Sequence, residues 1–591
     1  MERKWLFRPT TADVDTLSQA IGIPTALARV LAVRGYNTAE SANAYLNAEQ
    51  IKLAPLSQFC DMDKAVNLTV HAIEQENKIF IFGDYDADGI MSTVILYKTL
   101  QKLKAQVSYY IPNRIDEGYG LNNQAISAIA AQGGNLILAC DNGTSSFEQI
   151  DYANSLGLTV VVLDHHDLTK DKSGKDIMPN AAALVNPKRD DCAYPFKLFS
   201  AGGICYRFAE ALLRRQGLSW EDYAESLLPF AVISTVCDLV DLTGENRILV
   251  KKGLPLLTSS NNHGLKALIN ETGCPKDHLD AYHIAFVLGP CINASGRLDA
   301  ASQAVELFIT DDANTAAAQA AFLVQLNSSR KEMTMSGYLQ IAKEVAKMDI
   351  NQEKVLVLYS PEIRESVAGI IAGKIKSRFN RPTIMICGEK DILRGSCRSV
   401  DGYNIFEALS ECKDLFLAFG GHPMAAGFSI LATDVVKLRQ RLNENCCLSC
   451  EEMLPVTHVD KMMPLSQVNL ELIYQFKKME PFGKANSLPL FAETDLLLTK
   501  VTLMGKMGQF MRLQVKNTHG QSCELLSFDA KERLEQAVCK LYSQERWNRL
   551  TSGKDEEIPF DAVYSIAINS YNGRERQQMQ LYDFRLGASK A

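Results

Sequence analysis

The sequence contains no apolar run that approaches the roughly 18 consecutive residues a helix needs to cross a bilayer. Its first residues, MERKWLFRPTTADVD, have no apolar stretch after the basic positions, so we expect no secretion signal. Both absences favour a cytoplasmic protein with no membrane segment.

Three other features are missing. No G-x-S-x-G motif signals a nucleophilic serine. Cys446, Cys447 and Cys450 form a CxxC-like cluster, but no second pair stands nearby to complete a zinc site. The formal net charge is −7, so the surface is not broadly basic. Binding of nucleic acid stays open, because it needs only a local positive groove.

The stretch KIFIFGDYDADGIMS, residues 78–92, combines an apolar strand pattern with crowded acidic groups. The run Ile79–Phe82 ends at a glycine, and Asp84, Asp86 and Asp88 then alternate with other residues before an apolar helical segment. Functional groups in α/β sheets gather beyond the carboxyl ends of the strands. Like charges crowded there repel one another unless a cation lies between them.

The same arrangement recurs downstream. A short apolar strand, 135–140, is followed by Asp141, and another, 159–163, is followed by Asp164, His165 and His166. An apolar helix then leads to Asp238. Because helical stretches separate the strands, we expect parallel strands in βαβ units, with all these side chains at one edge.

Such a set contains six carboxylates and two imidazoles, which suits two divalent ions better than one. Two metals about 3.5–4 Å apart are a common solution for hydrolysing phosphate esters. Histidine among the ligands favours Mn²⁺ over Mg²⁺. The alternative for each residue alone is a helix cap or a satisfied polar group in a core.

The chain of 591 residues is long enough for three or four domains, and we predict an α/β protein. Residues 1–75 are predicted as an N-terminal helical segment, 76–297 as a first α/β domain and 298–350 as a long connecting helix. Residues 351–450 are predicted as a second α/β domain and 454–591 as an OB-like β-barrel. In the second domain, Gly420-Gly421-His422 reads as a glycine turn whose backbone N–H groups suit an anion.

These motifs resemble the DHH phosphoesterase superfamily and, within it, the RecJ family of single-strand-specific exonucleases. The resemblance runs over most of the chain. It is carried by GDYDADG at 83–89, EGYG at 117–120, DNG at 141–143, DHHD at 164–167, VNPKR at 185–189 and STVCDLVDLTGENR at 234–247. It continues with GPCINASGRLDAA at 289–301, GSCRSVDG at 395–402, GGHPMAAG at 420–427 and EPFGKANSLPLF at 480–491.

The resemblance implies a DHH domain (76–297), a DHHA1 domain (351–450) and a C-terminal OB fold that binds nucleic acid. It implies 5′-to-3′ hydrolysis of single-stranded DNA in repair and recombination, with two Mn²⁺ or Mg²⁺ ions. A single-strand-binding protein and a helicase are expected partners. The implied metal ligands are Asp86, Asp88, Asp141, His165 and Asp238, with Asp141 bridging.

By the same resemblance, Asp84 and His166 complete the catalytic cluster or orient water and phosphate. Arg297, Arg398 and the Gly420-Gly421-His422 turn hold the nucleic-acid backbone. The chain departs from the family pattern at some positions. Cys291 stands where arginine is usual, Asn404 where histidine is common, Ser487 replaces a usual proline, and 363–367 lacks a Trp-His-x-Gly-Val sequence. We expect fewer phosphate contacts at position 291.

Two other functions remain open. The first is a DHH phosphodiesterase for short oligonucleotides or cyclic dinucleotides, for which the region after residue 454 would be superfluous. The second is a DHH-derived replication factor that binds DNA without catalysis, for which some of the acidic cluster should be lost.

Overall fold

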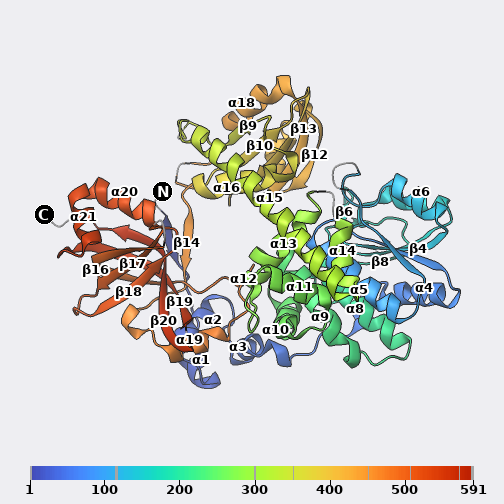
Figure 1. Cartoon of the computed structure of the whole chain (residues 1–591), viewed down its shortest axis with the longest axis horizontal. Helices are drawn as coiled ribbons and strands as arrows, with labels where there is room; N and C mark the ends of the chain where they lie inside the picture. The colour runs from blue at the N-terminus through green and yellow to red at the C-terminus, as the bar shows by residue number, and fades with distance from the viewer. Residues whose placement is uncertain are drawn as a thin grey trace.

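The computed structural model describes residues 3–113, 117–298, 301–350, 352–449, 451–505, 508–571 and 573–587. Cys450, from the predicted cysteine cluster, lies outside these residues, as do positions 299 and 300 of the motif at 289–301. Figure 1 shows three bodies: a large α/β body, a smaller α/β body and a β-barrel. The described cysteines are all free.

The large body is built on a parallel sheet with strand order β3-β2-β4-β5-β8. Its strands confirm the three predicted runs, and their bounds are β2 (Lys78–Phe82), β3 (Val107–Tyr110), β4 (Gly134–Cys140), β5 (Thr159–Leu163) and β8 (Ala183–Val185). Successive side chains point to opposite faces, so Ile79 and Ile81 join one buried cluster while Phe80 and Phe82 join another.

Helices cover both faces of this sheet, as expected of parallel strands. The helices α6 (Asn123–Ala131) and α7 (Phe147–Ser155) pack on the side of Phe80. The opposite side carries α4 (Met62–Glu74), α5 (Ala87–Lys102), α8 (Ala201–Arg215) and α9 (Glu221–Cys237). Further helices extend this side, namely α10 (Gly244–Ser259), α11 (His263–Glu271), α12 (Ala281–His283), the π-helix η3 (Ile284–Leu288) and α13 (Gly289–Ser295).

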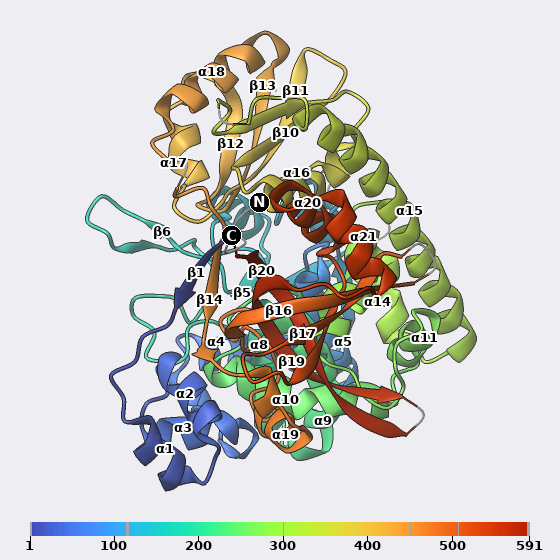
Figure 2. The ribbon, with the colours of Figure 1, turned by 90° about the vertical axis from the view of Figure 1, so that its left-hand side faces the viewer.

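The predicted connector is two helices rather than one, α14 (Ala301–Ile309) and α15 (Ala313–Val345). The break arises at Asp312, whose side chain caps α15 by accepting a hydrogen bond from the backbone N–H of Thr315. With 33 residues, α15 is about 50 Å long. It runs from α11 and α14 to α16 of the smaller body (Figure 2).

The smaller α/β body has a mixed sheet with strand order β12-β13-β11-β10-β9. Its strands are β9 (Leu356–Tyr359), β10 (Thr383–Cys387), β11 (Ile392–Arg398), β12 (Phe416–His422) and β13 (Ala425–Leu431). Its helices are α16 (Glu365–Phe379), α17 (Ile405–Ser410) and α18 (Val435–Asn445). The helices and strands predicted between residues 354 and 412 are confirmed.

The barrel closes because β16 pairs with both β17 and β19. The strands follow one another as β16 (Phe491–Met504), β17 (Phe510–Lys516), β18 (Ser522–Ser527), β20 (Arg574–Leu586) and β19 (Ile558–Tyr571). Two helices, α20 (Lys531–Leu541) and α21 (Gln544–Ser552), lie between β18 and β19 in sequence. The predicted α/β class with a C-terminal OB-like barrel is confirmed.

The segment 1–75 is divided between two bodies. Strand β1 (Lys4–Phe7) pairs with β14 (Val456–Val459), and α1 (Val14–Ile21), α2 (Thr25–Val33) and α3 (Ala39–Leu46) share a core with the barrel. Helix α4 instead packs on the first sheet. No single helix within the described ranges is long and apolar enough to span a membrane. Taken together, α1 and α2 have sufficient length and apolar composition, but they are bent by 116° where they meet.

Arg247 joins the large body to this N-terminal and barrel unit. Its side chain is 1 % exposed and donates hydrogen bonds to the carbonyl oxygens of Tyr45, Lys478 and Met479 over 2.9–3.1 Å. The guanidinium also lies 4.0 Å from the centre of the Tyr45 ring. One buried cation therefore fixes three segments that are distant in sequence.

Candidate metal centre and nucleic-acid groove

Acidic residues follow three neighbouring strands at one edge of the first sheet. Asp84 follows β2, Asp141 follows β4 and Asp164 follows β5, and all three are buried. Their ligand atoms, with those of nearby residues, form three overlapping groups within which all atoms lie less than 4.8 Å apart. The groups are Asp141 with Asp164, His165 and His166; Asp88 with His165 and Asp238; and Asp84 with Asp86 and Asp141.

Asp86 and Asp88 are positioned by helix termini. Asp86 is the N-cap of α5 and accepts hydrogen bonds from the backbone N–H groups of Asp88 and Gly89. Gly89 is required here, because a Cβ at this position would lie 2.5 Å from the backbone nitrogen of Asp84. The first turn of α5 can therefore pack directly against the end of β2.

Asp88 is held by donors that lie far away in sequence. The backbone N–H groups of Ala201 and Gly202, at the start of α8, donate to its carboxylate over 2.8 and 2.9 Å. The Ser234 hydroxyl on α9 donates over 2.5 Å. A helix N-terminus suits a carboxylate, so these contacts hold the Asp88 side chain at the centre of the cluster.

His165 lies where three carboxylates converge. Its Nε2 is 3.3 Å from Asp141 Oδ1, 3.6 Å from Asp238 Oδ2 and 3.7 Å from Asp88 Oδ2. This nitrogen is buried and makes no hydrogen bond within the described part of the chain. Burial lowers the pKa of His165, which favours the neutral imidazole that ligates metals. Asp141 itself has a left-handed backbone, with φ of 62°.

Asp164 contacts both histidines and fixes their positions. Its carboxylate accepts hydrogen bonds from the backbone N–H groups of Thr144 and His165 and lies 2.7 Å from His166 Nδ1. Burial alone would raise the pKa of Asp164, but the charges of His166 and His165, together with hydrogen bonds from His166 and Thr144, outweigh burial and hold this pKa well below the usual range. Burial likewise opposes the charge on His166, yet Asp164 raises its pKa to about 9.

The rest of the cluster has more negative charge than the protein compensates. Burial and the nearby Asp88 carboxylate raise the pKa of Asp141 well above its ordinary value and that of Asp238 to about 8. Burial and Asp88 also raise the pKa of Asp86. Crowded oxygens with one bare imidazole nitrogen fit divalent cations such as Mn²⁺ or Mg²⁺. The predicted metal, Asp84 and His166 positions are thus all brought together.

The predicted backbone-binding residues lie between the two α/β bodies. Arg297, directly after α13, donates from Nη1 to the carbonyl of Ser366 on α16 over 2.8 Å. The Arg398 guanidinium, at the end of β11, approaches the same helix at Gly369. A hydrogen bond from Lys188 and, more weakly, the charge of His422 lower the pKa of Asp167, so His422 faces the first body.

The predicted glycine turn at Gly420-Gly421-His422 is wrong. These residues form the end of β12, and Gly420 pairs with Gly427, Gly421 with Ala426 and His422 with Ala425. The hairpin turn itself falls at Pro423 and Met424. A run of glycines fits a turn and a tightly paired strand equally well in sequence, and the pairing with β13 decides between them. Because β12 is the edge strand, one side of its backbone still faces outward.

Several residues that support the site were not singled out from the sequence. Ser234 and the start of α8 hold Asp88, and the Tyr119 hydroxyl donates to the Asp141 carbonyl over 2.8 Å. Asn186 Nδ2 donates to the carbonyl of His166 over 2.9 Å. Tyr119, Asn186 and Ser234 lie in stretches that also carry the family resemblance, which is the only signal that could have identified them.

The departures from the family pattern have local structural roles. Cys291 is 2 % exposed and its thiol accepts a hydrogen bond from Asn327 Nδ2 over 3.3 Å. Ile363 and Val367 are buried in a core shared with α15. Asn404 caps α17, and the carbonyl of Ser487 accepts a hydrogen bond from Arg34.

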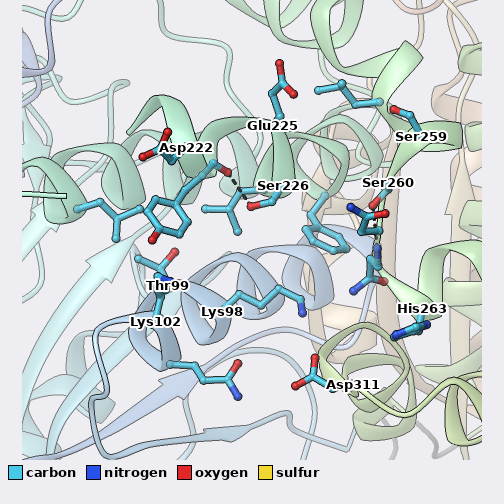
Figure 3. A pocket seen from close by; sticks show the side chains of 18 of the residues that line it. Lys98, Thr99, Lys102, Asp222, Glu225, Ser226, Ser259, Ser260, His263 and Asp311 are labelled. Carbon is cyan, nitrogen blue, oxygen red and sulfur yellow. Dashed lines mark hydrogen bonds between the residues drawn. The ribbon is translucent and has the colours of Figure 1, made fainter. Parts of the chain in front are cut away.

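A separate cavity of about 670 Å³ opens at the other end of α5 (Figure 3). Lys98 lies about 18 Å along the helix from Asp86, from the rise per residue. Acidic and basic side chains both line the cavity, including Lys98, Lys102, Asp222, Glu225 and Asp311. The mixed charge gives no preference for phosphate, and the cavity is distinct from the metal centre.

Three family models match the chain in order. They are the DHH family N-terminal domain at 78–233, the DHHA1 domain at 352–446 and the RecJ OB domain at 459–583. The chain is 35% identical over 583 residues to the single-stranded-DNA-specific exonuclease RecJ of Bacillus subtilis, covering 98% of this chain and 70% of that protein. It is 32% identical to RecJ of Escherichia coli, covering 79% of this chain and 83% of that one.

Solved structures of RecJ proteins have a similar fold. RecJ of Thermus thermophilus in complex with Mn²⁺ matches with a TM-score of 0.79 and 25% identity, covering 98% of this chain and 79% of that chain. An exonuclease RecJ bound to manganese matches with a TM-score of 0.58 and 30% identity, covering 67% of this chain and 95% of that chain.

Fold and site together define a DHH-type phosphoesterase with a DHHA1 domain and an additional OB domain. The extent and identity of the matches go further than this class. The chain belongs to the RecJ family of single-stranded-DNA-specific exonucleases.

Proposed function

We propose that this chain is a metal-dependent exodeoxyribonuclease that removes nucleotides from single-stranded DNA in the 5′-to-3′ direction, in repair and recombination. The observation that supports this most is the overlap of the ligand groups. His165 and Asp141 each belong to two of the three groups, so ligands can be shared between two ions. Bound ions would lower the pKa of a water and stabilise the attacking and leaving oxygens.

In this proposal Asp86, Asp88, Asp141, His165 and Asp238 hold the metals, and Asp141 bridges them. Asp84 completes the cluster at the end of β2. His166, kept protonated by Asp164, offers a positive charge beside the metal ligands and can hold a phosphate oxygen. Tyr119 contacts both His166 and the Asp141 carbonyl, and so fixes the relative position of these two residues.

A phosphodiesterase for short oligonucleotides or cyclic dinucleotides is the second candidate. The closed barrel favours a longer strand, because OB folds commonly bind single strands along a groove. A single-strand-binding protein and a helicase are proposed partners, since a single strand must first be generated and kept unpaired. The proposed location is the cytoplasm, where the free cysteines would stay reduced.

The test compares 5′-labelled and 3′-labelled single strands, blunt duplex of the same sequence and a dinucleotide, each with Mn²⁺, Mg²⁺ or EDTA. We expect the single strand to lose its 5′ label first as mononucleotides, the duplex to resist and EDTA to stop the reaction. Preferred hydrolysis of the dinucleotide would favour the second candidate. Binding of the single strand without any hydrolysis in Mn²⁺ would contradict both.

A further inference from the structure

Helix α15 carries a polar stretch where it passes between the two α/β bodies. Before it, Leu323 is buried in the core of the first body, and after it, Ile341 is buried in the core of the second. Between them, Asn327, Arg330 and Thr334 follow one another at spacings of three and four. This spacing places the three side chains on one face of the helix.

Arg330 is fixed by its neighbour on this face. Asn327 is 3 % exposed, and its Oδ1 accepts hydrogen bonds from Arg330 Nε and Nη2 over 3.1 and 2.8 Å. The amide nitrogen of Asn327 donates in turn to Cys291 Sγ on α13. A buried amide therefore orients the guanidinium, so less side-chain freedom remains to be lost on binding a ligand.

The charge of Arg330 is not neutralised by the protein. The side chain is half-buried, and no carboxylate of the described residues lies within ion-pair distance of it. Burial lowers the pKa of Arg330, although the group stays charged at neutral pH. Its Nη1 has no hydrogen-bond partner among the described residues. A half-buried cation of this kind is costly unless an anion approaches it.

A second polar group on the same face also lacks a partner. Thr334 is 2 % exposed, and its hydroxyl makes no hydrogen bond within the described ranges. Buried hydroxyls usually make a hydrogen bond, and a threonine within a helix commonly donates to the carbonyl four residues earlier. The Thr334 hydroxyl does not make this bond. Within the described residues, one face of α15 thus carries a guanidinium with no carboxylate partner and, one turn on, a buried hydroxyl with no hydrogen bond.

Helix α13 links this face to the metal centre. Asn293 on α13 accepts a hydrogen bond from the backbone N–H of Ala87, next to Asp86. Cys291 on the same helix accepts one from Asn327, and Arg297 just beyond it reaches Ser366 of the second body. Arg330 therefore lies one short helix away from the metal centre, at the junction that Arg297 spans.

We infer that Arg330, oriented by Asn327, binds a backbone phosphate of the single strand at the junction between the two α/β bodies. The inference rests on the proposed function. It assigns to α15 the positive charge that Cys291, buried beneath Asn327, does not provide.

The test measures binding of a 3′-labelled, nuclease-resistant phosphorothioate single strand in Mn²⁺ over a range of NaCl concentrations. Loss of one phosphate contact should make the slope of log K against log salt shallower by ~0.7. We expect R330Q to show this change and about tenfold weaker binding. R330K should keep the slope. The matched control is K343Q, which removes an exposed charge from the same helix.

An R330Q variant with the wild-type slope would overturn the inference, even if its affinity fell, because a packing defect does not change the number of phosphates contacted. If R330Q melts well below the wild type, its binding cannot be compared, and the accessibility of Arg330 is measured instead by phenylglyoxal modification of arginines in the wild-type protein. Arg330 should be protected by the bound strand, and unchanged modification would contradict the inference. If the wild-type protein neither binds nor degrades single strands, the proposed function fails instead.

Discussion

His165 Nε2 lies 3.3 Å from Asp141 Oδ1, at the ends of two neighbouring parallel strands. His165 also approaches Asp88 and Asp238, whereas Asp141 also belongs to the group with Asp84 and Asp86. This pair therefore connects both halves of the cluster. One ion bound by the Asp88, His165 and Asp238 group and another bound by the Asp84, Asp86 and Asp141 group would therefore each be held by one member of this pair.

Asp141→Ala should lower hydrolysis of single-stranded DNA by several orders of magnitude, because the residue would serve both ions. The fold should survive, and the metal-free protein should melt at the same or a higher temperature, since one of several repelling charges is gone. Turnover and melting temperature check this. Asp167→Ala is the control, because its side chain is 74% exposed and belongs to none of the ligand groups. Near-wild-type turnover of Asp141→Ala would refute the bridging role.

Ser234→Ala should weaken Mn²⁺ binding by about 10- to 100-fold, because it removes a donor that orients Asp88 behind the metal. Titration with Mn²⁺, followed by melting temperature and activity, measures the change. Ser226→Ala on the same helix is the control, since that hydroxyl only bonds the carbonyl of Tyr223. Equal Mn²⁺ affinity in both variants would show that Asp88 needs no such support.

Stability of the metal-free protein should fall as pH rises from about 4 to 8. The folded pKa of Asp238 is raised to about 8, so in this window the native state binds more protons than the unfolded state does. Stability therefore decreases with pH, and Mn²⁺ should remove the decrease. Asp238→Asn should flatten the slope in EDTA. Chemical denaturation at several pH values tests this, and identical slopes for both proteins would contradict it.

A truncation that removes only residues 454–591 should aggregate. Helices α1–α3 would lose the barrel core against which they pack, and their apolar side chains would be exposed. Removal of residues 1–48 as well should restore solubility and retain hydrolysis of short strands, with weaker binding of long ones. Gel filtration and strand-length dependence measure both effects. A soluble, active protein from the first truncation would show that the N-terminal helices do not depend on the barrel.

The strands and their acidic ends could be predicted because the signals are local. An apolar run followed by Asp84, Asp141 or Asp164 is visible within a few residues, and parallel βαβ units bring such ends to one edge. Asp238 stands after a helix rather than a strand, and the apolar run of that helix made it a candidate that the family motifs then supported as a metal ligand.

What could not be predicted depends on distant pairings. Asp88 is held by residues more than one hundred positions away, and β1 pairs with β14 across most of the chain. Cys291 is buried against Asn327 of α15, and no local sequence pattern predicts this contact. The glycines at 420 and 421 are ambiguous until β13 is placed beside them.

The most direct test of the two-metal site is anomalous diffraction from crystals grown with Mn²⁺. We predict two manganese peaks, one on each side of Asp141, within ligand distance of Asp86, Asp88, Asp141, His165 and Asp238. A single peak, or peaks that do not contact His165 and Asp141, would contradict it.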